Sequence, residues 1–157
     1  MRATSEWGVR QATAEDRAFL EEIAERLTIG MAPWRDREIM LATMRGFLLD
    51  DLNEMGDEKA VYIATRADGA PVGVATIGVG KNYTGETQAY LGELAVRAEV
   101  EGRGAASALL ARVEEWAREH ALPFVVLDTG SLNTHARAFY ARHGYGEESV
   151  RLVKSLP

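Results

Sequence analysis

The residues with the clearest chemical use form a run of small side chains at the start of a predicted helix. The run Gly102, Arg103, Gly104, Ala105, Ala106, Ser107 follows an apolar strand and a short charged loop. Small residues let a ligand approach the backbone, and the free N–H groups and dipole of a helix N-terminus attract anions. The sequence therefore predicts a site for a phosphate-bearing ligand at the end of a strand.

Two common phosphate-binding motifs fit this run poorly. A P-loop would end in Gly-Lys-Ser or Gly-Lys-Thr, and that sequence is absent. A dinucleotide motif turns tightly off its strand and ends in Gly or Ala, whereas here the loop from Val96 to Gly102 is long and Ser107 stands last. Asp128, its candidate ribose ligand, lies further on than that motif requires. A helix start that is rich in small residues only for close packing is a further alternative.

A third motif fits better. Residues 101–106 (EGRGAA) resemble the pyrophosphate-binding motif of the GNAT-type N-acetyltransferase superfamily, which reads Gln or Arg, two variable residues, Gly, one variable residue, then Gly or Ala. Gly104 and Ala106 match this motif. Glu101 departs from it, because a carboxylate replaces the usual cation or amide and would repel a nearby phosphate unless it turns to Arg103 or to solvent.

A second stretch, residues 128–145 (DTGSLNTHARAFYARHGY), resembles the other signature of the same superfamily. That signature has an Asn opening a helix, then Ala, then Phe-Tyr, then Gly and an aromatic residue. The matching residues are Asn133, Ala136, Phe139, Tyr140, Gly144 and Tyr145. The two motifs stand in the expected order with a strand between them, and the order of elements elsewhere agrees with the family.

The resemblance implies coenzyme A as the ligand and assigns roles to residues. The backbone of Leu94 and Val96, with Ala95 between them, would pair with the pantetheine arm as another strand does. The Leu94 N–H would donate to the thioester oxygen. Tyr140 would be the general acid for the leaving thiolate, although a core aromatic fits its position too. Asn133 would cap its helix or bind the pantetheine amide, and Ala136 and Phe139 would line the cofactor site.

Glu93 interrupts the apolar run from Tyr90 to Val96. A carboxylate on such a strand is either exposed or placed for function. As a general base, it would take a proton from an ammonium acceptor, directly or through water, and partial burial would raise its proton affinity for that work. Two other interpretations remain open: Glu93 binds the cationic acceptor, or it is a solvated or ion-paired surface residue.

Composition limits the remaining functional classes. The 157 residues suit one domain, 1–157, with a single core. The absence of cysteine excludes disulfides, thiolate zinc sites and a Cys nucleophile, and the three histidines lack metal spacing, so we expect no metal site. The net charge of −6 argues against broad nucleic-acid binding. The N-terminal residues carry no apolar run typical of a signal peptide, and no stretch is long enough for a membrane span.

Hydrophobic periodicity predicts the elements around these motifs. We expect an α/β fold (an α+β mixed sheet) that is GNAT-like, with about six or seven strands in a partly parallel sheet and about four helices. Strands are expected at Trp7–Arg10, Ala60–Thr65, Val72–Val79, Thr87–Val96, Phe124–Leu127 and Ser149–Val153. Of these, Phe124–Leu127 is wholly apolar, as in a parallel strand buried on both faces. Helices are expected after Thr13, where residues 13–16 resemble a capping box, from Met40 to a stop near Gly56, after Gly104, and over Asn133–His143.

Together these observations predict an N-acetyltransferase that moves an acetyl group from acetyl-CoA to a primary amine by direct attack. We expect a small-molecule or peptide amine as acceptor, lined by Thr28–Trp34, Tyr90, Glu93 and the Lys81–Gly85 loop. We expect a cytoplasmic protein that binds neither nucleic acid nor membrane, and a homodimer stays open. A non-catalytic acyl-CoA-binding or sensing domain is the main alternative, and a nucleotide-binding oxidoreductase is a third.

Overall fold

The computed structural model describes residues 6–157. The first five residues, part of the segment predicted to carry no signal peptide, lie outside the described residues. The α-helices and strands, with short 3-10 helices (η) between them, follow in this order: β1 (Gly8–Gln11), η1 (Ala14–Asp16), α1 (Arg17–Ile23), η2 (Ala24–Thr28), α2 (Arg37–Asn53), β2 (Lys59–Thr65), β3 (Pro71–Lys81), β4 (Thr87–Val96), η3 (Ala98–Val100), α3 (Ala105–Glu119), β5 (Val125–Val126) and α4 (Thr134–Arg142).

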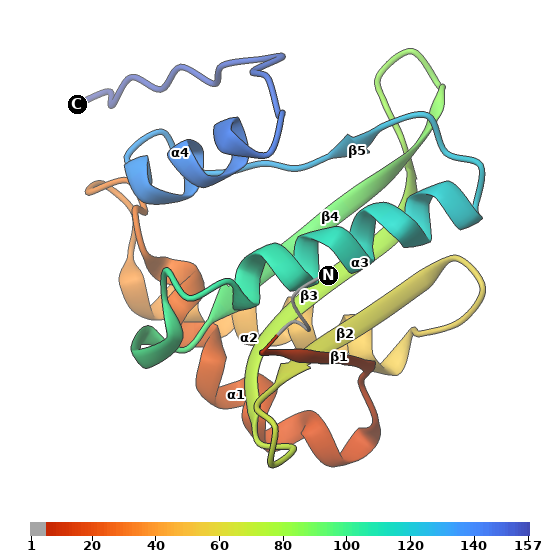
Figure 1. Cartoon of the computed structure of the whole chain (residues 1–157). Helices are drawn as coiled ribbons and strands as arrows, with labels where there is room; N and C mark the ends of the chain where they lie inside the picture. The colour runs from red at the N-terminus through yellow and green to blue at the C-terminus, as the bar shows by residue number, and fades with distance from the viewer. Residues whose placement is uncertain (1–5) are drawn as a thin grey trace.

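The strands form one mixed sheet in the order β1-β2-β3-β4-β5 (Figure 1). The first four strands are antiparallel to their neighbours, and β5 pairs with β4 in parallel through the crossover helix α3. The predicted mixed sheet with four α-helices is therefore confirmed. The described residues hold five strands in this sheet, slightly fewer than expected.

Side chains alternate between two cores on the two faces of the sheet. In β2, Tyr62 and Ala64 belong to the core under α3, whereas Val61 and Ile63 belong to the core against α1 and α2. The inner face of α3 is buried and includes Leu109, Leu110, Val113, Trp116 and Ala117. The sheet is thus covered by α3 on one face and by α1 and α2 on the other (Figure 1).

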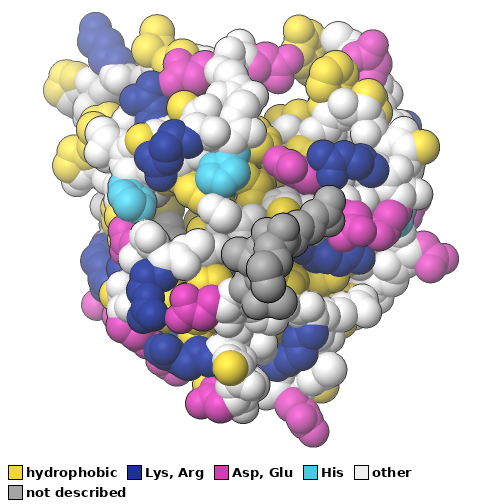
Figure 2. Space-filling model, in the orientation of Figure 1, with side chains coloured by type: hydrophobic (Ala, Val, Ile, Leu, Met, Phe, Trp, Pro, Cys, Tyr) yellow, Lys and Arg dark blue, Asp and Glu magenta, His cyan; other side chains and the backbone are white. Residues whose placement is uncertain are grey.

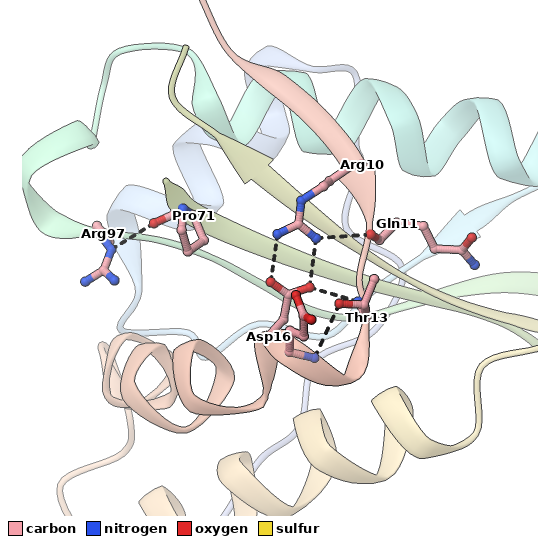
Figure 3. Close-up of polar contacts among 7 residues, drawn as sticks. Arg10, Gln11, Thr13, Asp16, Pro71 and Arg97 are labelled. Carbon is pink, nitrogen blue, oxygen red and sulfur yellow. Dashed lines mark hydrogen bonds and ion pairs between the residues drawn. The ribbon is translucent and has the colours of Figure 1, made fainter. Parts of the chain in front are cut away.

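The entry into the first helical segment is fixed by the predicted capping box. The Thr13 hydroxyl accepts a hydrogen bond from the Glu15 N–H, and the Asp16 carboxylate accepts one from the Thr13 N–H at 2.8 Å. Both oxygens of Asp16 also accept hydrogen bonds from Arg10 at 2.8 Å, so β1 is tied to this turn (Figure 3). The Arg10 hydrogen bonds keep the pKa of Asp16 below its usual value, although burial opposes them.

Three predicted features of the elements are wrong. Ser149–Val153 forms no strand, because its alternating apolar pattern meets no partner strand, and Leu152 is 89% exposed. The strand predicted at Phe124–Leu127 pairs only at Val125 and Val126 and is not buried on both faces, since it lies at the sheet edge. Gly56 is not the residue that ends α2, which stops at Asn53; the Gly56 N–H donates to the Lys59 carbonyl at 2.9 Å in an isolated bridge just before β2.

The face that carries α3 and α4 shows cationic and acidic side chains intermixed (Figure 2). Arg103 pairs with Glu6, Arg112 with Glu115 and Glu119, and Arg137 with Glu147. This face therefore offers no continuous basic surface. Among the described helices, none combines the length and hydropathy needed to cross a membrane.

Candidate functional site

The site begins with an irregularity in β4. Ala75 of β3 pairs with Leu94, and Ile77 pairs with Leu91, so Thr76 faces both Gly92 and Glu93. Two residues opposite one define a β-bulge. The buried Thr76 hydroxyl accepts a hydrogen bond from the Glu93 N–H at 3.0 Å, which satisfies the amide that the bulge removes from the ladder. Because the bulge inserts one extra residue into β4, the alternation shifts by one residue there. The set of residues whose N–H groups point away from β3 therefore differs before and after the bulge.

Beyond the bulge, β4 presents backbone groups on the side away from β3. The Arg97 N–H donates to the Val72 carbonyl at 2.7 Å, and alternation along an antiparallel ladder then turns the N–H and C=O groups of Leu94 and Val96 to the opposite edge. On that edge, β5 pairs only with Ala89 and Tyr90, and the chain after β5 then diverges from β4 (Figure 1). Both backbone groups of Leu94 and the N–H of Val96 can therefore pair with an extended ligand, whereas the Val96 carbonyl already accepts a hydrogen bond from the Arg26 side chain.

Ala95, the third predicted residue of this segment, is placed differently. Its buried side chain packs in the core against α1 and α2, and the same alternation turns its backbone groups toward β3. Ala95 thus supports the strand from within, whereas Leu94 and Val96 offer backbone groups to a ligand.

Glu93 lies at the centre of this arrangement, largely withdrawn from solvent. Burial raises the pKa of Glu93 to about 7, with a further contribution from the negative charge of Asp51 on α2. The carboxyl group therefore changes protonation near neutral pH. This state fits a proton acceptor better than it fits a solvated surface glutamate.

Tyr140 lies on α4 within electrostatic range of Glu93. Burial first, and the Glu93 charge second, raise its pKa far above the usual value, so its phenol stays protonated at neutral pH and can donate a proton. Phe139 and Tyr145 pack edge-on against its ring, with centroids 5.2 and 5.6 Å away. The predicted pair Glu93 and Tyr140 is thus brought together from β4 and α4.

The helix start that the sequence singled out has three amides without intrahelical partners. Gly104 takes a left-handed conformation (φ +96°) before Ala105, and no side chain caps the helix. The first intrahelical bond runs from the Ala108 N–H to the Gly104 carbonyl. The amides of Ala105, Ala106 and Ser107 are therefore available to an anion. Gly102 (φ +74°) shapes the preceding turn.

The side chains of Arg103 and Ser107, next to this helix start, contact other residues of the chain. Arg103 pairs with Glu6 at 3.1 Å and lies over the Trp7 ring, while the Trp7 indole donates to the Arg103 carbonyl at 2.8 Å. Ser107 contacts the His143 imidazole at 3.1 Å, which links α3 to the end of α4. The groups that the start of α3 could offer to an anion are therefore its backbone amides.

Glu101 does not pair with Arg103, which was one of the two alternatives, and its side chain stays partly exposed to solvent, which was the other. One of its carboxylate oxygens pairs with Arg26 of η2, and the other lies 3.1 Å from the His135 imidazole of α4. The Arg26 Nε also donates to the Val96 carbonyl at 3.0 Å. The Glu101 carboxylate therefore bridges η2 and α4. Its cationic partner, Arg26, comes from a segment that is far away in the sequence.

Asn133 caps α4 by accepting a hydrogen bond from the Ala136 N–H at 3.1 Å, and its Nδ2 donates to the Ile29 carbonyl at 3.3 Å. A Cβ on Gly30 would lie only 2.5 Å from the Asn133 side chain, so Gly30 permits this close approach. Asn133 thus caps α4, and a contact between Asn133 and pantetheine stays a prediction. Ala136 receives the cap, and Phe139 packs against Tyr140 and His143.

Sequence patterns did not reveal three other residues of the site. Asp51 and Thr76 meet β4 at the bulge, but the bulge is visible only in the strand register. Arg26 lies in a helical segment that is far from both motifs in the sequence, although it contacts Glu101 in the folded chain. Tyr90, expected near an acceptor, donates to Asp128 at 2.7 Å across the start of the β4–β5 split. No short-range sequence pattern links Asp51, Thr76 or Arg26 to the residues that they contact, because these contacts form only in the folded chain.

Comparisons with known proteins agree with this fold. Residues 31–145 match the model of the acetyltransferase (GNAT) family. An aminoglycoside N(6')-acetyltransferase type 1 of Stenotrophomonas maltophilia is 30% identical over 149 residues, which cover 92% of this chain and 89% of that protein.

Solved structures share the fold at lower identity. The PaiA N-acetyltransferase of Thermoplasma acidophilum, in complex with coenzyme A, superimposes with a TM-score of 0.77 at 18% identity over 92% of each chain. AAC(6')-Iy, in complex with the bisubstrate analogue CoA-S-monomethyl-acetylneamine, gives a TM-score of 0.69 at 22% identity over 98% of this chain and all of that one.

Proposed function

This chain belongs to the GNAT family of acetyltransferases and transfers an acetyl group from acetyl-CoA to an amine, and we propose that Glu93 and Tyr140 carry the proton transfers to and from a small polycationic acceptor. One observation carries the proposal. Glu93, with a pKa near 7, lies beside the unpaired edge of β4 and within electrostatic range of Tyr140.

The residues on this face fit the acetyl donor. The outward backbone groups of Leu94 and Val96 would hold the pantetheine arm, and the three free amides of α3 would hold the pyrophosphate. Acetyl-CoA supplies the activated acetyl thioester, and the protein orients it.

The chain's groups then divide the proton transfers. Glu93 takes a proton from the acceptor ammonium, and the neutral amine nitrogen attacks the carbonyl carbon. The Leu94 N–H donates to the carbonyl oxygen as negative charge develops there. The new C–N bond forms, the C–S bond breaks, and Tyr140 gives its phenolic proton to the leaving sulfur. The second proton that the attacking nitrogen loses restores the Tyr140 phenol, and Glu93 releases its own proton to solvent.

Acidic groups around the bulge favour a cationic acceptor. Glu93 lies on β4, Asp51 on α2 acts on Glu93 through its charge, and Asp128, after β5, accepts a hydrogen bond from Tyr90 of β4. Their combined field attracts positively charged ligands. The 30% identical relative is named for acetylating aminoglycosides, which carry several ammonium groups. We infer an aminoglycoside or a similar polyamine as the acceptor class.

An acceptor screen that reads out free CoA thiol tests the proposal. We expect turnover with aminoglycosides and linear polyamines above that with simple monoamines. Tyr140→Phe should lower turnover about ten- to a thousandfold with little change in CoA affinity. Tyr62→Phe, at a buried phenol that lies beneath Arg112 of α3, is the matched control. CoA binding without turnover of any amine would favour a non-catalytic acyl-CoA-binding domain instead.

A further inference from the structure

The bulge in β4 brings a carboxylate of α2 against the backbone next to Glu93. A Cβ on Gly92 would lie 2.7 Å from the Thr76 hydroxyl oxygen and 3.7 Å from Oδ2 of Asp51. Asp51 therefore approaches the same two bulged residues that Thr76 contacts. A larger side chain at position 92 would displace these groups.

Asp51 is fixed in this position by an ion pair. Its Oδ1 accepts a hydrogen bond from Lys59 Nζ at 2.8 Å, and Lys59 also donates to Glu54 at 2.7 Å. These two hydrogen bonds are the main causes that raise the pKa of Lys59. The Asp51 side chain is only 18% exposed. Because Oδ1 is engaged by Lys59, Oδ2 is the oxygen that faces the bulge.

Among the described residues, the groups that interact electrostatically with Glu93 are a carboxylate and two phenols. Asp51 comes from α2, Tyr90 from β4 and Tyr140 from α4, and Asp128 is joined to Tyr90 by a hydrogen bond. Of these, Asp51 is the group whose charge adds to burial in favouring the protonated form of Glu93. Asp51 therefore influences the strength of the base through space.

We propose that Asp51 is a positioning residue for the acetyl transfer, and that its fixed charge beside the β4 bulge makes Glu93 a strong enough proton acceptor for an ammonium substrate. This inference rests on the proposed function, in which Glu93 is the base. A carboxylate with the usual low proton affinity would accept a proton from an ammonium less readily.

The test is the pH dependence of kcat/KM. For Asp51→Asn, we expect the acid limb to move down by about 0.5–1 pH unit, because one like charge is removed while the amide oxygen still accepts from Lys59. Asp50→Asn is the matched control, since Asp50 is the adjacent, exposed carboxylate of α2. Its acid limb should coincide with that of the wild type.

An unmoved limb in Asp51→Asn would overturn the inference and leave Asp51 a structural residue. A rise in the acceptor KM at every pH, with the limb unmoved, would overturn it too and make Asp51 an acceptor-binding residue. If Asp51→Asn does not fold, Lys59→Met tests the pair from the other side. Removing the ammonium leaves the Asp51 charge less neutralised, so the limb should move up, and a limb that stays or moves down contradicts the inference.

Direct titration of the Glu93 carboxyl by carbon-13 NMR separates this inference from the proposed function. Loss of the acid limb in Glu93→Gln would support Glu93 as the base, whereas a retained limb would remove that role. In either case, a lower Glu93 midpoint in Asp51→Asn than in Asp50→Asn supports the coupling, and identical midpoints refute it.

Discussion

At the residue scale, Glu93 illustrates how a site is built at a cost in stability. Its carboxyl group is largely buried, and burial, followed by the negative charge of Asp51, is the cause of its raised pKa. A group of this kind lowers the stability of the folded state whenever it is ionised. The residue that favours proton transfer is therefore expected to oppose folding at alkaline pH.

The sign of this effect follows from linkage. Glu93 has a pKa near 7 when folded and near its ordinary value when unfolded, so above that ordinary value the unfolded chain binds fewer protons. The contribution of Glu93 to the free energy of unfolding is fully present below about pH 4.5 and is lost as the pH rises toward 7. We expect Glu93→Gln to raise the free energy of unfolding at pH 8 by about 1–3 kcal/mol.

Urea denaturation at pH 4.5 and pH 8 would measure this difference. Glu86→Gln, an exposed carboxylate just before β4, is the control and should show no such dependence on pH. A Glu93→Gln variant less stable than the wild type at pH 8 would mean that the carboxylate is stabilised in the fold, contrary to the raised pKa.

At the scale of elements, the capping box shows what a local sequence motif can predict. Thr13 and Asp16 stand at the spacing of the motif, and the structure confirms both of its hydrogen bonds. The motif did not reveal that Arg10 completes the arrangement from β1 (Figure 3). Asp16 is buried, so its loss would leave the Arg10 guanidinium and the Thr13 N–H without their main acceptor.

We therefore expect Asp16→Asn to lower the free energy of unfolding by about 1–3 kcal/mol at pH 7. Because the pKa of Asp16 is lowered, its contribution is present above the ordinary carboxyl pKa and is lost as the pH falls through the folded value. The difference between wild type and variant should thus shrink in acid. Glu15→Gln, exposed in the same turn, should change stability little in a thermal melt.

The uncapped start of α3 permits a test that separates binding from folding. An acidic side chain in the first turn of a helix stabilises it by about 0.3–1 kcal/mol, yet it competes with a bound phosphate for the same amides. We expect Ala106→Asp to leave the protein folded, with the helix-start gain offset by the partial packing of Ala106 against the core, and to weaken CoA binding at least about tenfold.

Calorimetry with CoA would measure the loss, and Ala111→Asp is the matched control. Ala111 lies exposed further along α3, so the same charge there should leave CoA affinity nearly unchanged. Equal affinities for the two variants would remove the phosphate site from the helix start. Gly104 is less suited to such a test, because its positive φ would strain any side chain placed there.

At the scale of the whole molecule, periodicity predicted most elements, since α3, β2, β3 and β4 bury one face or both in long, regular patterns. Periodicity failed where strand pairing depends on segments that are far apart in the sequence. Residues 149–153 have a strand pattern but no partner among the described strands, and β5 is cut to two residues by the split from β4. The bulge at Gly92 and Glu93 and the Arg26–Glu101 pair likewise depend on contacts between distant segments.

The overall charge adds a property that no single contact shows. The chain carries 24 acidic and 18 basic residues, a net charge of −6, and its acceptor region adds Glu93, Asp51 and Asp128. Such a field raises the local concentration of cations and is screened by salt over about 8–10 Å at physiological ionic strength. Acceptors with several ammonium groups should feel this field more strongly than acceptors with one.

We therefore expect the acceptor KM to rise with salt in proportion to acceptor charge. Between low ionic strength and about 0.5 M salt, the KM of a tetracationic aminoglycoside should increase several-fold, whereas that of a monoamine should change little, because screening weakens each additional charge contact. The CoA affinity of the same samples provides the internal control, since the anion site at α3 should weaken regardless of the acceptor. Steady-state kinetics at fixed pH would decide the matter. Equal salt dependence for both acceptors would mean that recognition rests on shape and hydrogen bonds, and that the acidic groups around the bulge serve the chemistry rather than the choice of substrate.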